Sequence, residues 1–181
     1  MSQPHHNLQL EHARELINRG ELTEAEEILT KVEKNLDGAS AKKEMIIDLK
    51  NEKGKILFRR GNYEAAKHLL EEALSNAREC SYEYGVGYAL HYLGATTWNL
   101  GEADHALDLY EQALNIRRRI GDHRGATASL HNIAMCQSQR GNIREALALY
   151  KVSKDSIGQK LTMKALREVY ILLGDDEKAR E

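Results

Sequence analysis

The sequence predicts an all-α fold, a right-handed superhelical solenoid built from antiparallel helix pairs. Glycine recurs every 40 residues, at Gly61, Gly101 and Gly141, and an alanine follows five residues after each one. A fixed period of this length is typical of helical repeat arrays. The only proline is Pro4, so no helix is interrupted by proline later in the chain.

Glycine tolerates the left-handed conformation that ends helices, and Asn62 stands where an N-cap residue is expected. These signals divide the chain into a flexible tail over residues 1–6 and one domain over 7–181. The predicted repeats span approximately 7–40, 41–80, 81–122, 123–159 and an incomplete 160–181. The predicted helices are 7–20, 21–37, 41–60, 62–80, 83–100, 102–120, 123–140, 142–157 and 160–173.

The clearest copy of the repeat, residues 88–122, reads YALHYLGATTWNLGEADHALDLYEQALNIRRRIGD. It has Leu93-Gly94 in its first helix and Ala106, Tyr110 and Ala113 in its second. This pattern resembles the tetratricopeptide repeat (TPR) family. The longer period resembles the family's extended subclass, which includes kinesin light chains, G-protein-regulating polarity scaffolds and bacterial peptide-sensing regulators. The resemblance implies a protein-interaction scaffold that binds a peptide segment or helix of a partner in a concave groove.

Composition narrows the class of partner. The formal net charge is −2, which gives no general attraction to nucleic acid or to an anionic membrane. No stretch reaches the roughly 18 apolar residues of a membrane-spanning helix. Cys80 and Cys136 have no metal or redox spacing, and we expect them to be small apolar residues of a cytoplasmic protein.

In such an array the first helices of the pairs line the groove, and residues three or four apart share a helix face. Aromatic rings on that face supply rigid contact area, and amides can bond a peptide backbone. The residues expected to bind a partner are Lys55, Phe58, Arg59, Tyr88, His91, Tyr92, Trp98, Asn99, His131, Asn132, Met135 and Gln139.

The resemblance singles out Asn132, because in the extended subclass an asparagine just before the Leu-Gly position contacts the backbone of a bound peptide. Tyr92 fills that position in the preceding repeat. A solvated amide on an exposed helix is the alternative interpretation for Asn132. We expect Trp98 to be partly exposed and the basic run 117–119, near a helix C-terminus, to be solvated.

The sequence leaves two other functions open. The apolar helix 160–173 has a short partner, which predicts a homodimer through this helix or a continuation of the chain that covers it. A metal-dependent enzyme would use His91 and His131 with Glu52 or Asp48, but metal sites take three or four convergent ligands. No phosphate-binding glycine loop or nucleophile motif is present. We therefore expect no enzymatic activity, no cofactor and no metal.

Overall fold

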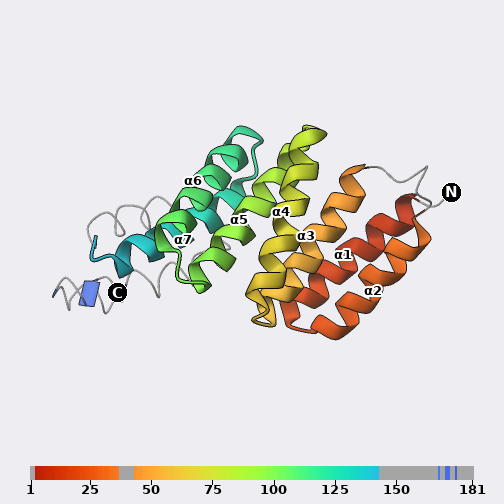
Figure 1. Cartoon of the computed structure of the whole chain (residues 1–181), viewed down its shortest axis with the longest axis horizontal. Helices are drawn as coiled ribbons and strands as arrows, with labels where there is room; N and C mark the ends of the chain where they lie inside the picture. The colour runs from red at the N-terminus through yellow and green to blue at the C-terminus, as the bar shows by residue number, and fades with distance from the viewer. Residues whose placement is uncertain (1–2, 37–42, 143–166, 168–169, 172–173, 175–181) are drawn as a thin grey trace.

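The computed structural model of the chain describes residues 3–36, 43–142, 167, 170, 171 and 174. Within these residues the chain forms helices and turns, without a strand. The helices pack in antiparallel pairs along an elongated array (Figure 1). They are α1 (Gln3–Arg19), α2 (Leu22–Asn35), α3 (Lys43–Arg59), α4 (Tyr63–Glu79), α5 (Glu83–Asn99), α6 (Ala103–Arg119) and α7 (His123–Gln139). This arrangement confirms the predicted all-α solenoid of helix pairs.

The period of the array comes from its tight turns. Gly61, Gly101 and Gly141 have φ angles of 79°, 87° and 81°, in the left-handed region that glycine adopts without a steric penalty. The predicted role of these glycines in ending helices is therefore confirmed. The turn between α4 and α5 differs, because Ser81 adopts a φ of 56° at the position that Gly121 fills one repeat later.

The Leu-Gly motif permits close packing between the two helices of a pair. A Cβ atom at Gly94 would lie 2.9 Å from ring carbons of Tyr110, and one at Gly54 would lie 2.6 Å from Cγ of Leu70. Gly54 and Gly94 are 40 residues apart, as are Leu70 and Tyr110, so the same contact repeats in two pairs. The glycine is needed because the side chain of the second helix fills the space that a Cβ would occupy.

We expect Gly94→Ala to lower the free energy of unfolding by about 1–3 kcal/mol through overpacking against Tyr110. This loss must exceed the gain of about 1 kcal/mol that alanine brings to a helix interior. Gly87→Ala is the control, since its Cβ would meet the Arg117 side chain at the looser distance of 3.2 Å. Urea unfolding of both variants is the measurement, and a Gly94 variant as stable as the wild type would contradict this packing.

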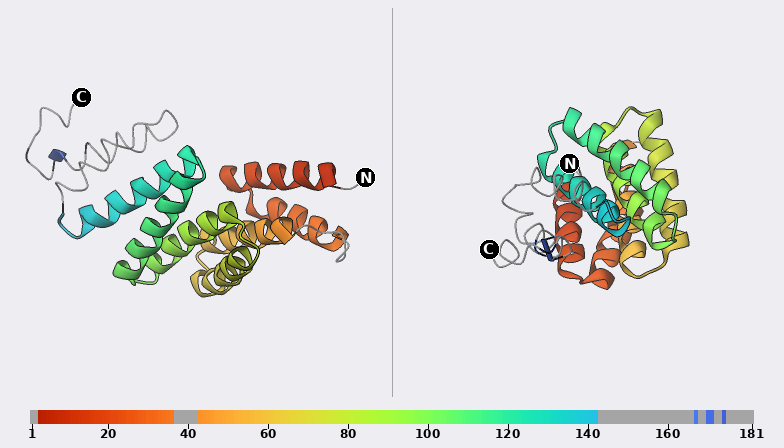
Figure 2. Two further views of the ribbon diagram at one scale, coloured as in Figure 1. Left: turned by 90° about the horizontal axis from the view of Figure 1, so that it is seen from above. Right: turned by 90° about the vertical axis from the view of Figure 1, so that its left-hand side faces the viewer.

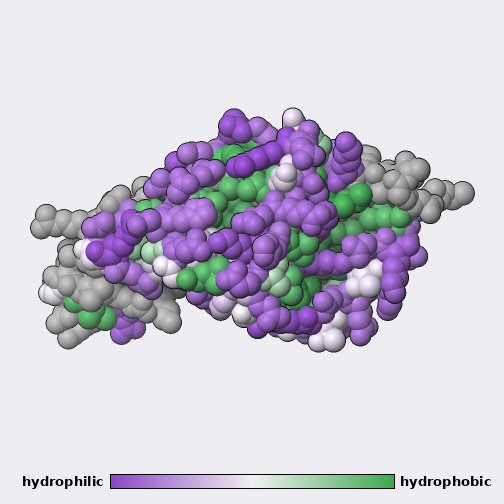
Figure 3. All heavy atoms as spheres, in the orientation of Figure 1, coloured by the Kyte–Doolittle hydropathy of each residue, from purple (hydrophilic) through white to green (hydrophobic). Residues whose placement is uncertain are grey.

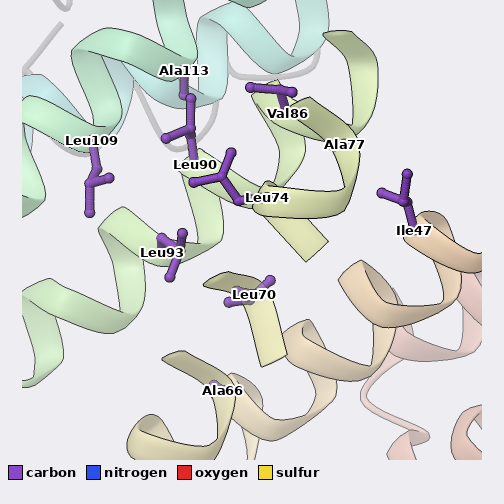
Figure 4. Packing of buried hydrophobic residues seen from close by; sticks show 11 residues of the cluster. Ile47, Ala66, Leu70, Leu74, Ala77, Val86, Leu90, Leu93, Leu109 and Ala113 are labelled. Carbon is purple, nitrogen blue, oxygen red and sulfur yellow. The ribbon is translucent and has the colours of Figure 1, made fainter. Parts of the chain in front are cut away.

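Buried apolar side chains in the described part of the chain form clusters that neighbouring pairs share. One joins α1, α2 and α3, a second joins α3 to α6, and a third joins α5, α6 and α7. Figure 4 shows the second cluster, with Leu74 of α4 beside Leu90 of α5. Cys136 is buried in the third cluster and Cys80 is half-buried against the second. Each pair therefore stabilises the next, as in other solenoids.

The array curves, and the first helix of each pair lies on its inner side. Seen from above in Figure 2, α1 and α7 lie on the same side of α3 and α5. Consecutive first helices touch, α1 with α3, α3 with α5 and α5 with α7. We call the surface formed by these four helices the inner face. Polar side chains cover much of the surface seen in Figure 3, with apolar atoms between the helices. None of the described helices has the length and apolar character needed to cross a membrane.

Two local predictions are corrected. Residues 3–6 form the start of α1 and His6 is 7% exposed, so a flexible tail is wrong for these residues. The helix includes Pro4 because proline is tolerated in a first turn. Asn62 occupies the N-cap position of α4 but its side chain makes no capping hydrogen bond. Asp122 does cap α7, accepting a hydrogen bond of 2.8 Å from the Gly125 amide.

The predicted helices 142–157 and 160–173 fall almost entirely outside the described residues. Of the segment expected to form a homodimer, the structure describes only residues 167, 170 and 171. Dimerisation through this helix therefore stays a prediction, as do the predicted repeat boundaries.

Candidate functional site

Four tyrosines run along the inner face at the start of and within α5. Tyr82, Tyr84, Tyr88 and Tyr92 have successive ring-centroid separations of 6.1, 6.3 and 4.9 Å, and we call them the tyrosine row. Residues four apart lie on one side of a helix, which aligns the last three. Phe58 of α3 extends the row, with its ring 6.2 Å from that of Tyr92. Tyr84 is exposed and the other rings of the row are half-buried, so the row presents part of its aromatic area to solvent.

Two acidic side chains of α3 lie beneath the row, and their carboxylate oxygens accept hydrogen bonds from other residues of the chain. Glu52 is 0% exposed and accepts hydrogen bonds from Arg14 Nε at 2.6 Å and from the Tyr88 hydroxyl at 2.9 Å. Asp48 accepts from Arg14 at 3.2 Å and from the Tyr82 hydroxyl at 3.1 Å. Each of the four carboxylate oxygens therefore has a partner. Burial, reinforced by Glu52, raises the pKa of Tyr88 well above its ordinary value.

Lys55, predicted as a site residue, lies on the inner face between α1 and α5. Its Nζ donates to the Asn18 side-chain oxygen at 3.0 Å and stands 5.5 Å from the centre of the Tyr92 ring, a cation–π distance. Arg59, also predicted, is exposed and donates to the backbone carbonyl of Ile17. Burial lowers the pKa of Lys55, and nearby arginines lower it further while Glu52 opposes them.

His91 was expected on the groove surface, and this placement is wrong. It is 9% exposed, with Nδ1 3.2 Å from the Ser129 hydroxyl and its ring packed edge-on against Tyr92 and Tyr110. Because α7 packs against α5, the side chain is enclosed between the two helices. Burial, followed by the charges of Arg117 and Lys55, lowers the pKa of His91 well below its ordinary value.

This burial predicts a dependence of stability on pH. A histidine whose pKa is lower in the folded state binds fewer protons there than when unfolded, so stability falls as pH drops below the unfolded pKa of about 6.5. The slope from one such group is at most about 1.4 kcal/mol per pH unit. His131, whose pKa burial also lowers, acts in the same direction.

We expect His91→Asn to flatten the decline in unfolding free energy between neutral and mildly acidic pH. His105→Asn is the control, because His105 is exposed on α6. Chemical unfolding measured at several pH values tests this. Equal slopes for wild type and His91→Asn would mean that His91 is accessible to protons in the folded chain.

The basic run 117–119 divides into one buried and two exposed residues. Arg117 is 5% exposed and donates to the Gly125 carbonyl at 2.7 Å and to the Ser129 hydroxyl at 3.0 Å, so its predicted solvation is wrong. The start of α7 packs over it, and Gly125 leaves room for its side chain. Arg118 and Arg119 are exposed, as predicted.

The other predicted residues lie at several depths. Trp98 is half-buried against the third apolar cluster, which confirms its predicted partial exposure. Asn99 is exposed, but its amide donates to the Ala95 carbonyl of its own helix at 2.8 Å. Asn132 is half-buried as a hydrogen-bond partner of the Tyr110 hydroxyl, so it is not a freely solvated amide.

The remaining predicted residues belong to α7. His131 and Met135 are half-buried, and Gln139 is exposed near the end of the helix. In the described part of the chain, no three histidine, cysteine, aspartate or glutamate side chains converge as metal ligands would. The inner face therefore offers chemistry for contact with a ligand, through aromatic rings, amides and cations.

Five contributors to this face were not predicted from the sequence. They are Arg14, Asn18, Tyr82, Tyr84 and Arg124. Tyr84 is four residues before Tyr88, and Arg124 is four before Ala128, so helical spacing could have placed both on the face. Arg14 lies on α1, and nothing in its local sequence shows that it reaches the buried acids of α3.

Comparison with known proteins agrees with this architecture. The tetratricopeptide repeat family model matches residues 45–119 and 85–157. BtubC (BKLC) from P. vanneervenii superposes with a TM-score of 0.75 at 17% identity, covering 93% of this chain and 72% of that one. Among curated proteins no sequence matches.

Two solved structures with bound peptides also share the fold. The Rap conjugation gene regulator of plasmid pLS20, in complex with the Phr* peptide, superposes with a TM-score of 0.81 at 16% identity, covering 97% of this chain and 50% of that one. NprR in complex with its cognate peptide NprX gives 0.67 at 17% identity, covering 96% and 52%. The chain thus spans about half the length of each of these proteins. The family match extends over more than half of the sequence, and the chain belongs to the tetratricopeptide repeat family.

Proposed function

We propose that this chain is a protein-interaction scaffold that binds a peptide segment of a partner protein along its inner face. In this proposal it works in the cytoplasm and without catalysis. The observation that carries the proposal is the tyrosine row, extended by Phe58 and bordered by Lys55. Aromatic side chains present large, rigid contact area and are enriched where proteins bind partners.

The polar groups around the row support recognition of a peptide. Tyr84 is 40% exposed at one end of the row, and half-buried Trp98 lies farther along the same helix. Because internal contacts already fix Tyr82 and Tyr88 through their hydroxyls, little ordering of these rings is needed on binding. The Rap regulator and NprR, whose structures contain bound peptides, are similar in fold, which is consistent with this mode.

A random peptide library displayed on phage tests the proposal. Peptides selected on the wild-type chain are synthesised with a fluorescent label, and their affinity is measured by fluorescence anisotropy. We expect Ala128→Trp, which places a bulky uncharged side chain on an exposed inner position of α7, to raise Kd at least about tenfold by blocking the face, a loss of about 1.4 kcal/mol.

Ala65→Trp is the matched control, because Ala65 is exposed on α4, a second helix of its pair. It should leave Kd unchanged, and both variants should have the same melting temperature as the wild type. Failure to select any peptide, or equal binding by Ala128→Trp and the wild type, would contradict the proposal.

A further inference from the structure

The inner face carries more cations than its buried acids balance. Asp48 and Glu52 together balance Arg14, which they bond, and Lys55, on which Glu52 also acts, so Arg59 and Arg124 remain as the excess charge. Among the described residues, Lys55, Arg59 and Arg124 make no ion pair with a carboxylate. The formal charge of the chain is −2, so this excess is local.

Lys55 lies among the cations of the inner face. It is 8% exposed, and its partners are the neutral Asn18 amide oxygen and the face of the Tyr92 ring. Burial lowers its pKa, Glu52 opposes this shift, and Arg59, Arg14 and Arg124 each lower the pKa further. Cations from α1, α3 and α7 therefore lie close enough to act on one buried ammonium group, and an added anion would stabilise it.

Arg59 and Arg124 are exposed, and neither forms an ion pair with a described carboxylate. Arg59 donates to the backbone carbonyl of Ile17, a neutral acceptor. Arg124 is the second residue of α7, where the positive end of the helix dipole opposes a cation. The N-cap residue Asp122 offsets part of this effect, but its carboxylate bonds the Gly125 amide and lies 3.7 Å from Arg117. Arg124 itself has no carboxylate partner among the described residues.

We propose that the inner face selects a partner segment with two or more aspartate or glutamate side chains, which pair with Lys55, Arg59 and Arg124 while its backbone lies on the tyrosine row. This inference rests on the proposed function and adds the chemistry of the partner. The three cations come from different places on α3 and α7, which suits several side chains better than one terminal carboxylate. Complementary charge would also speed association and exclude basic segments.

The test uses the peptides selected from the phage library. We expect them to be enriched in aspartate and glutamate over the unselected library. Arg124→Gln and Arg59→Gln should each raise Kd about three- to fivefold, the scale of an exposed ion pair. Lys55→Met should raise Kd about tenfold, because its charge is buried. Arg118→Gln, an exposed arginine on α6, is the matched control and should bind as the wild type does.

Peptides in which amides replace the acidic side chains test whether those side chains carry the charge that the inner face binds. Versions with asparagine or glutamine in place of the acids should bind weakly and equally to the wild type and Arg124→Gln. Amidation of the peptide C-terminus should have no effect, and a loss of binding on amidation would overturn the assignment to side chains. Preference for a phosphorylated serine over glutamate at the same position would identify phosphate instead and also overturn it.

The outcomes separate this inference from the proposed function. Some selected peptides could be blocked by Ala128→Trp and yet lack acidic enrichment, or bind Arg124→Gln, Arg59→Gln and Lys55→Met as they bind the wild type. Such peptides would overturn the inference and leave the scaffold function intact. Failure to select peptides would overturn both. Melting curves of the three variants show whether each is folded, and the two exposed arginine variants carry the test if Lys55→Met is not.

Discussion

Ala106→Asp is expected to destabilise the fold by about 3 kcal/mol or more, enough to abolish cooperative unfolding in a marginally stable array. Ala106 is 0% exposed on α6 and belongs to the apolar cluster that α5, α6 and α7 share. Tyr110 and Leu130 are members of the same cluster. A carboxylate placed there is removed from water without a paired cation, and its charged form is strongly disfavoured.

The matched control is Ala65→Asp, because Ala65 is exposed on α4 one residue before Ala66, the equivalent of Ala106. The same chemical change at an exposed position should alter the unfolding free energy by less than about 0.5 kcal/mol. Circular dichroism during thermal and urea unfolding measures both variants. An Ala106→Asp variant as stable as the control would show that the helix contacts at this position are absent in solution.

The second large effect is expected for Glu52→Ala, with a loss of about 3 kcal/mol in the free energy of unfolding. Glu52 is fully buried and joins Arg14 of α1 to Tyr88 of α5, so its removal leaves a guanidinium and a phenol with lost partners across three repeats. Burial opposes the charge of Arg14, and the ion pair with Glu52 compensates by raising the pKa of Arg14 above its ordinary value.

Glu71→Ala is the control, since Glu71 is exposed on α4. A double-mutant cycle with Arg14→Ala should reveal a coupling energy of about 0.5–3 kcal/mol between Arg14 and Glu52. Additive effects of the two substitutions would mean that the ion pair contributes nothing to the contact between α1 and α3.

The fold was predictable because its determinants are local and periodic. The glycines with positive φ lie at the turns. The contact between Gly94 and Tyr110 permits the close approach of the two helices of one pair. Helix starts were less predictable. Asn62 precedes a second helix and Asp122 a first helix; both residue types are good N-caps, but only Asp122 makes the capping hydrogen bond.

The depth of each side chain on the inner face depends on what the next repeat places against it. His91 and His131 are 40 residues apart, yet His91 is buried against Ser129 while His131 is half-buried. Arg117 belongs to a run of three arginines, and only the approach of Gly125 and Ser129 encloses it. Such contacts join helices through the curvature of the array, which the repeat pattern alone does not specify.

A crystal structure of the chain with a selected acidic peptide is the most direct measurement of the central claim. The peptide is expected to lie along α3, α5 and α7, against Tyr88 and Tyr92, with its carboxylates within ion-pair distance of Lys55 and Arg124. A peptide bound instead to the outer surface of α2, α4 or α6 would contradict the inner face as the site of recognition.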